Sequence, residues 1–262
     1  MHVSMFRARI RWCLPALLLL LAACSGIRPT APAVAPLADA RQLIVVTSAD
    51  WDAPSARLQR FERDDRGPWR QVGAEVPVML GRSGSAWGLG VHPPQTQGPQ
   101  KREGDGRAPA GIFAIGPAFG YAATGIGALP YLPMQASHYC IDVPASPLYN
   151  RIVDARDVGD EAVAGSTEPM RLDLHKDGDI RYRRGFVIEH NPDGVADHGS
   201  CIFAHLLRRA DETTAGCTAM DAAALDAVLQ WPDPAQTPRF VLLPEAEHTR
   251  LAASWQLPAM RP

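Results

Sequence analysis

The sequence has no excess of basic residues, and it has no apolar segment long enough to cross a bilayer. Its 262 residues include 26 Lys and Arg against 28 Asp and Glu, so we do not expect a nucleic-acid-binding protein. The apolar run from Trp12 to Ala23 has about a dozen residues, whereas a spanning helix needs roughly 20. There is also no internal repeat and no second shift in composition, which favours a single large domain.

The composition also does not favour long helices. The chain has 24 Pro and 22 Gly, and neither residue is well tolerated inside helices. This excludes a bundle of long helices or a coiled coil. A turn-rich, mainly β protein is expected instead.

The N-terminus has the features of an export signal. Arg7, Arg9 and Arg11 precede the apolar run, as in a secretory signal peptide. The run ends in Leu-Ala-Ala-Cys24, which resembles the lipobox of bacterial lipoproteins. That resemblance implies removal of residues 1–23, lipidation of Cys24 and, with Ser25 next, a location in the periplasm on the outer membrane. A plain signal peptide followed by a chance cysteine is the alternative.

Cleavage would change both the charge and the organisation of the chain. Residues 1–23 contain three arginines and no acidic residue, which leaves 23 basic and 28 acidic residues, a net charge of −5. Residues 24–40 are rich in Ala and Pro and predict an extended tether. Residues 41–262 form the predicted domain, which we expect to be monomeric.

Short apolar or alternating segments bounded by turn residues predict a series of strands. These segments are 43–46, 57–62, 76–80, 111–115, 185–189, 201–205 and 239–243. One clear helix is predicted from Asp221 to Trp231, with Asp221 as its N-cap and Pro232 after its end.

A histidine and a cysteine near this helix suggest nucleophilic catalysis. His205 ends a predicted strand, and a polar loop leads from it to Gly216 and Cys217 just before the helix. A helix N-terminus stabilises a thiolate, and a neighbouring histidine can accept the thiol proton. Gly216 would allow close approach of a substrate, and N–H groups near Cys217 would form an oxyanion hole. A free cysteine that only fills the core is the alternative.

These residues resemble the catalytic core of the YkuD-type L,D-transpeptidase domain. Three further elements, upstream of this core, match one branch of that family in the same order. The matching segments are Lys101–Phe113, Tyr149-Asn150-Arg151, Phe186–Asn191, Ser200–His205 and Thr214–Cys217. The resemblance therefore covers about residues 100–220.

The resemblance implies a β-sandwich or barrel fold with a helix after the nucleophile loop, and an enzyme that needs no metal or other cofactor. Cys217 would attack a peptidoglycan stem peptide, commonly at meso-diaminopimelate, and expel D-alanine. His205 would be base and then acid, aligned by the carbonyl group of Leu206. The resulting thioester would pass to an amine or to water, and the sequence does not distinguish transpeptidation from hydrolysis.

The match also indicates substrate-binding residues. Thr214, Asn191, Tyr149 and Asn150 occupy positions of family elements. The usual histidine and arginine of the nucleophile motif are replaced by Ala215 and Ala219. Arg208 and Arg209 lie in the loop between the two catalytic residues, and we expect them to supply the missing positive charge; two solvated arginines are the alternative.

Two other functions are open. A catalytically inactive lipoprotein that binds peptidoglycan would explain the lost histidine and arginine. A zinc-dependent peptidase is the third, because His198, Cys201, His205 and Cys217 are four nitrogen or sulfur ligands at usable spacings.

The remaining cysteines suggest a disulfide. Without the signal peptide and the lipidated Cys24, three thiols would reach an oxidising compartment, where cysteines tend to pair. We predict a bond between Cys140 and Cys201, with Cys217 free. Two buried thiols, or a bond between Cys201 and Cys217, are the alternatives.

Overall fold

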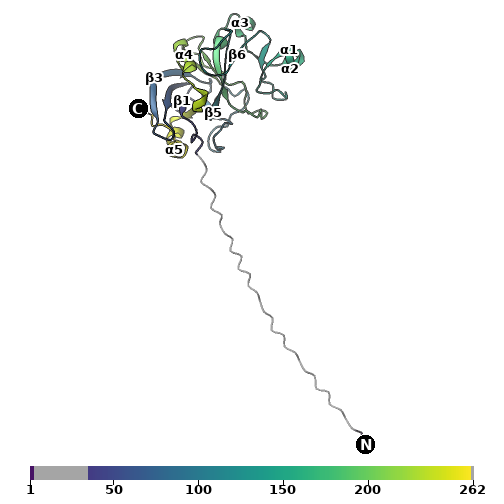
Figure 1. The fold of residues 1–262 in the computed structure, drawn as a ribbon. Helices are drawn as coiled ribbons and strands as arrows, with labels where there is room; N and C mark the ends of the chain where they lie inside the picture. The colour runs from purple at the N-terminus through teal and green to yellow at the C-terminus, as the bar shows by residue number, and fades with distance from the viewer. Residues whose placement is uncertain (3–34, 261–262) are drawn as a thin grey trace. The chain divides into compact units, whose positions relative to one another are not determined.

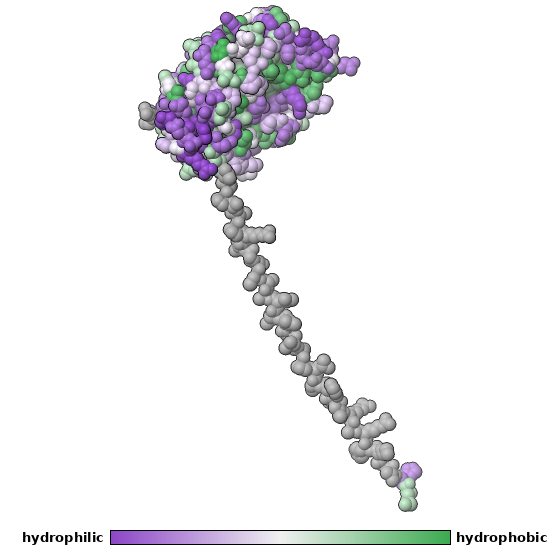
Figure 2. Space-filling model, in the orientation of Figure 1, coloured by the Kyte–Doolittle hydropathy of each residue, from purple (hydrophilic) through white to green (hydrophobic). Residues whose placement is uncertain are grey.

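The structure is a computed structural model that describes residues 1–2 and 35–260 (Figure 1). Residues 3–23 of the predicted signal peptide, Cys24 and most of the tether lie outside the described residues. Residues 35–260 belong to one compact unit, in which strands are about twice as frequent as helices, at 33% and 17%. Hydrophilic side chains cover much of the face seen in Figure 2, with smaller apolar patches between them. No helix among the described residues is long and apolar enough to cross a membrane.

Eight strands form a closed barrel, which confirms the predicted mainly β fold. Around the barrel the order is β10-β11-β12-β3-β2-β1-β13-β5, and β5 pairs again with β10. The bounds are β1 Gln42–Ser48, β2 Ser55–Glu62, β3 Arg70–Met79, β5 Ala108–Gly120, β10 Arg184–Glu189, β11 Phe203–Leu206, β12 Thr218–Met220 and β13 Arg239–Pro244. Two short strands, β4 (Ser85–Trp87) and β6 (Tyr131–Pro133), pair with β5 in parallel.

The first predicted strand segment is a fully buried strand of this barrel. All seven residues of β1 are buried, and β1 pairs with β2 in antiparallel and with β13 in parallel orientation. A strand that is covered on both faces needs no polar face, so the middle of β1, from Leu43 to Val46, is a continuous apolar run rather than an alternation.

The other predicted segments also fall on strands, but two predictions of strand ends were wrong. β5 continues through Gly116 and Pro117 to Gly120. Its pairing with β10 shifts register between Phe186 and Ile188, because Pro117 has no N–H group to donate and a β-bulge takes up the extra residue. β11 begins at Phe203, not at Cys201.

The predicted helix is present as α4 (Ala222–Gln230). The carboxylate of Asp221 accepts a hydrogen bond from the backbone N–H of Ala224 at 2.8 Å, as expected of an N-cap. A second helix, α5 (Glu245–Trp255), was not predicted. It buries only His248, Leu251 and Trp255, so its apolar stripe is thin and gives a weak periodic signal. A 3₁₀ turn, η2 (Pro234–Gln236), precedes β13.

Residues 134–182, here called the cap, are inserted between β6 and β10. They contain a three-stranded sheet in the order β8-β7-β9. The bounds are β7 His138–Cys140, β8 Ile152–Asp154, α1 Ala155–Val158, α2 Asp160–Val163, β9 Glu168–Pro169 and α3 Leu172–His175, and η1 (Arg181–Arg183) leads out of the cap. Met134, Cys140, Met170, Leu172 and Tyr182 of the cap form one apolar cluster with Phe203 and Cys217.

Candidate functional site

Cys217 lies in the turn that leads into β12, so the predicted position at the head of a helix was wrong. Three residues of β12 and Asp221, the N-cap of α4, separate Cys217 from α4. The electrostatic effect of a helix terminus is confined to its first turn. The dipole of α4 therefore does not stabilise a thiolate at Cys217.

Thr214 and Gly216 shape this turn. The Thr214 hydroxyl donates to the carbonyl oxygen of Cys217 at 2.7 Å and accepts from the N–H of Gly216 at 3.0 Å. A Cβ on Gly216 would lie 3.0 Å from the carbonyl oxygen of Arg107, so the close approach is to the protein's own backbone. Because its N–H is already bonded to Thr214, Gly216 does not offer a free oxyanion donor in this state.

The Cys217 sulfur lies in a niche made by the backbone just before and at the start of β11. It accepts a hydrogen bond from the N–H of Phe203 at 3.3 Å and donates to the carbonyl oxygen of Cys201 at 3.5 Å. The residue is only 8% exposed. Burial raises the pKa of the thiol to about 12, and the negative charge of Glu168 adds to that effect. The structure therefore presents a protonated thiol.

His205 lies on β11, which pairs with the strand that follows Cys217. β11 and β12 are parallel, with His205 opposite Ala219, and Cys217 is two residues before Ala219. Phe203, two residues before His205 on β11, shares the strand face of His205 and packs in one cluster with Cys217 and Tyr182. Tyr182 also contacts the His205 ring, so the imidazole and the thiol lie beside the same cluster.

The tautomer of His205 is set by its neighbour Leu206. Nδ1 of His205 lies 2.8 Å from the carbonyl oxygen of Leu206. A carbonyl oxygen only accepts, so Nδ1 carries the proton and Nε2 is left with a lone pair. Burial lowers the pKa of His205 to about 4, and the ring is neutral above that pH. This is the arrangement expected of a general base held by a backbone carbonyl.

Two cap residues near this pair were missed by the sequence analysis. The ring of Tyr182 packs edge-on against His205 with centroids 5.4 Å apart. Glu168 pairs with Cys140 across β9 and β7, and its charge raises the pKa of both Tyr182 and Cys217 after the larger effect of burial. No sequence signal marks either residue, because only the folding of the cap brings them to the site.

The two candidate arginines differ in position. Arg208 lies beside a very small cavity of about 10 Å³ next to His205, together with Arg181, Glu212 and Thr214. It pairs with Glu212 and lies 3.6 Å from Asp179. Arg209 contacts Glu212 at 3.7 Å but is 73% exposed. Because a single water needs a cavity of about this size, the space beside His205 is closed to a peptide in this state.

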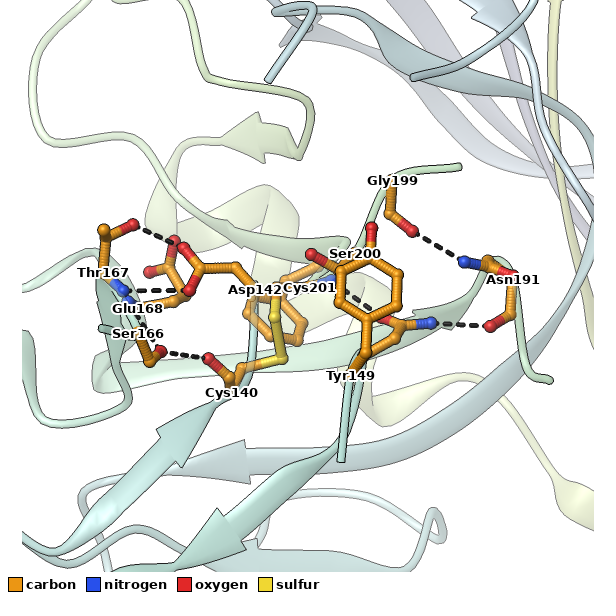
Figure 3. Close-up of a disulfide and its surroundings, with 12 residues drawn as sticks. Cys140, Asp142, Tyr149, Ser166, Thr167, Glu168, Asn191, Gly199, Ser200 and Cys201 are labelled. Carbon is orange, nitrogen blue, oxygen red and sulfur yellow. Dashed lines mark hydrogen bonds between the residues drawn. A yellow bond between two sulfur atoms is a disulfide. The ribbon is translucent and has the colours of Figure 1, made fainter. Parts of the chain in front are cut away.

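Asn150, together with Tyr149 and Asn191, which Figure 3 labels, organises the backbone that leads to Cys201. The Asn150 amide donates to the carbonyl oxygens of His190 and Asn191 and accepts from the N–H of Cys201, each at 2.8 Å. Asn191 donates to the carbonyl oxygen of Gly199 at 3.0 Å. The Tyr149 hydroxyl donates to Glu103. These side chains therefore hold a loop together and have no hydrogen bond to Cys217 or His205.

The predicted disulfide between Cys140 and Cys201 is present, and Cys217 is free. Figure 3 shows this bond joining the cap to the segment before β11. Cys201 has a φ of +56° and lies just before β11. Its bonded sulfur is not a zinc ligand, and no group of three or more His, Cys, Asp or Glu in residues 35–260 could hold a metal ion.

In comparisons with known proteins, no family model and no curated protein matches this chain. A neutral thiol, a neutral imidazole with a free Nε2 and a carbonyl group that fixes the ring are groups that can serve as a nucleophile, a base and an orienting group. These are the parts needed for acyl transfer.

Proposed function

We propose that this protein is an L,D-transpeptidase-type cysteine acyltransferase that acts on peptidoglycan stem peptides. One observation carries the proposal. The Nδ1–H of His205 is held by the carbonyl group of Leu206 at 2.8 Å, and the ring lies against Tyr182, which packs in the same cluster as the free thiol of Cys217. This fits the resemblance in sequence, in which the same three residues are the catalytic group.

In the proposed reaction, Nε2 of His205 takes the proton of Cys217 as the sulfur attacks the carbonyl carbon of the third stem residue. The bond to the terminal D-alanine breaks, and its amine leaves with the proton from His205. A thioester on Cys217 remains. An amine from a second stem, or water, then attacks the thioester and returns the proton to the sulfur through His205.

The reaction requires a more open state than the one described. Cys217 and His205 are 8% and 3% exposed, and burial favours the neutral form of each. The cap residues Tyr182 and Cys140 pack in the same cluster as Cys217. We propose that movement of the cap admits the stem peptide, and that the thiolate forms only when the thiol and the imidazole meet the substrate.

The closed site also supports a second candidate function, a lipoprotein that binds peptidoglycan without catalysis. The observation in its favour is that the N–H of Gly216 is bonded to Thr214 and is not directed to a substrate. In either case we propose a monomer anchored through lipidated Cys24 in the periplasm, on the outer membrane, with no nucleic-acid partner and no cofactor.

The test is incubation of the purified protein with disaccharide tetrapeptides, followed by mass spectrometry of the protein and the products. A thioester adduct on Cys217 and release of D-alanine are expected, and both should disappear in Cys217→Ala and fall sharply in His205→Gln. Crosslinked dimers would indicate transpeptidation, and shortened stems alone would indicate hydrolysis. Unchanged substrate with an intact Cys217 thiol would contradict the proposed acyltransferase activity and favour the non-catalytic peptidoglycan-binding lipoprotein.

A further inference from the structure

A groove of about 320 Å³ lies between the end of β10 and the cap. Val187 and Ile188 of β10 form part of its wall, and Ile152 of the cap forms another part. Cys201 and Phe203 also line it, and these are the two residues whose backbone holds the Cys217 thiol. The groove is therefore adjacent to the niche of the proposed nucleophile.

Two charged residues of opposite sign line this groove, and neither has a partner. Within residues 35–260, Arg151 and Glu189 form no ion pair or side-chain hydrogen bond, either with each other or with other residues. Three other arginines in or beside the cap are paired with aspartates, namely Arg156 with Asp154, Arg171 with Asp173 and Arg181 with Asp179.

The carboxylate of Glu189 is the more unusual of the two. It is partly buried, and burial raises its pKa with no compensating contact. An exposed arginine without a partner is common, but a partly buried carboxylate normally finds a donor. A ligand that brings a cation to this position would supply the missing donor.

The β-bulge in β5 makes room for this carboxylate. A Cβ on Gly116 would lie 2.1 Å from Oε1 of Glu189, so only glycine allows the carboxylate to fold over the strand here. Pro117, the next residue, lines the groove. Bulges often redirect a side chain beside a functional site, and this one accommodates the unpaired acid.

We propose that the groove binds a zwitterionic amino-acid group, with its ammonium on Glu189 and its carboxylate on Arg151. The proposal deepens the function proposed above and rests on it for the identity of the substrate, because such a group would belong to the peptide that Cys217 attacks. Binding itself requires no chemistry at Cys217 and is measured separately.

The experiment uses the purified protein with Cys217→Ser, titrated with three probes of similar length in a calorimeter. The probes are meso-2,6-diaminopimelate, pimelate, which lacks the amines, and 1,5-diaminopentane, which lacks the carboxylates. Diaminopimelate should bind, and each of the other two should bind about tenfold more weakly or not at all, because each leaves one charge of the groove unpaired.

Variants assign the binding to the groove. Glu189→Gln and Arg151→Gln should each weaken diaminopimelate binding by about tenfold or more. Gly116→Ala should do the same by displacing the carboxylate. The matched controls Glu161→Gln and Arg66→Gln change exposed charges elsewhere and should leave binding unaltered. Equal binding of the three probes, no binding of diaminopimelate, or unchanged binding in Glu189→Gln would overturn the proposal.

The two proposals fail in different ways. Loss of probe binding together with normal acylation of Cys217 by tetrapeptides would reject the zwitterion site and keep the acyltransferase. Normal probe binding that depends on Glu189, together with an unreactive Cys217, would keep the site and reject the acyltransferase.

Discussion

The thiol of Cys217 donates to the carbonyl oxygen of Cys201 at 3.5 Å, and the sulfur of Cys201 is itself bonded to Cys140 of the cap. The nucleophile's niche and the cap that covers it are thus joined by one covalent bond. Folding of the cap and burial of the thiol depend on the same residue.

The first prediction concerns this bond. Replacing both cysteines, as Cys140→Ser with Cys201→Ser, removes a crosslink between residues 61 apart. The loop-closure entropy of such a crosslink corresponds to about 4 kcal/mol. We expect the free energy of unfolding, measured in urea, to fall by about 2–4 kcal/mol.

The same variant should also make Cys217 more reactive. With the cap no longer tied to the segment before β11, alkylation of Cys217 by iodoacetamide in the native protein should be faster than in the parent. An alkylation rate equal to that of the parent would mean that the cap stays closed without the disulfide.

The second prediction concerns the thiol itself. Because burial raises the pKa of Cys217 to about 12, almost none of it is thiolate at pH 8. We expect native protein to be alkylated at least about a hundredfold more slowly than protein unfolded in urea at the same pH. The denatured sample of the same protein is the control, and comparable rates in the two samples would contradict the burial of the thiol.

The third prediction is a loss of stability in mild acid. Burial lowers the pKa of His205 and of His190 to about 4, from an ordinary value of 6.5. The unfolded chain therefore binds more protons between these values, so stability is greatest above pH 6.5 and falls as the pH drops towards 4. Each histidine contributes a loss of about 3 kcal/mol in the free energy of unfolding as the pH falls from 6.5 to 4.

Urea unfolding at pH 7, 6 and 5 measures this slope. His205→Gln should reduce the pH dependence by the share of one histidine, whereas replacing the exposed His198 should leave it unchanged. A slope that is the same in His205→Gln as in the parent would show that His205 is not buried as a neutral ring.

The fourth prediction concerns the turn before the nucleophile. Thr214→Val keeps the shape of the side chain but removes both hydrogen bonds of its hydroxyl, to the carbonyl of Cys217 and from the N–H of Gly216. The loss of buried bonds should cost about 1–3 kcal/mol of stability. It should also slow acylation of Cys217 by tetrapeptide.

Thr214→Ser keeps the hydroxyl and is the matched control, which should retain most of the stability and of the acylation rate. Unfolding in urea and the rate of adduct formation by mass spectrometry measure the two effects. Full stability in Thr214→Val would show that the turn is held by other contacts.

The sequence by itself determined the local elements. The apolar run from Leu43 to Val46 predicts a strand, and β1 is that strand. Asp221 and Pro232 set the bounds of α4 through capping and through the missing N–H of proline. The number of cysteines predicted one disulfide and one free thiol, and the resemblance that makes Cys217 the nucleophile left Cys140 and Cys201 for the bond that the structure shows.

The tertiary structure decided what the spacing of residues could not. The strand β12, only three residues long, separates Cys217 from α4, so the thiol is buried beside Phe203 and its pKa is raised rather than lowered. Glu168 and Tyr182 reach the site only because the cap folds over β11. Protonation states depend on burial and on neighbours distant in the chain, and these are properties of the packed molecule rather than of any segment of its sequence.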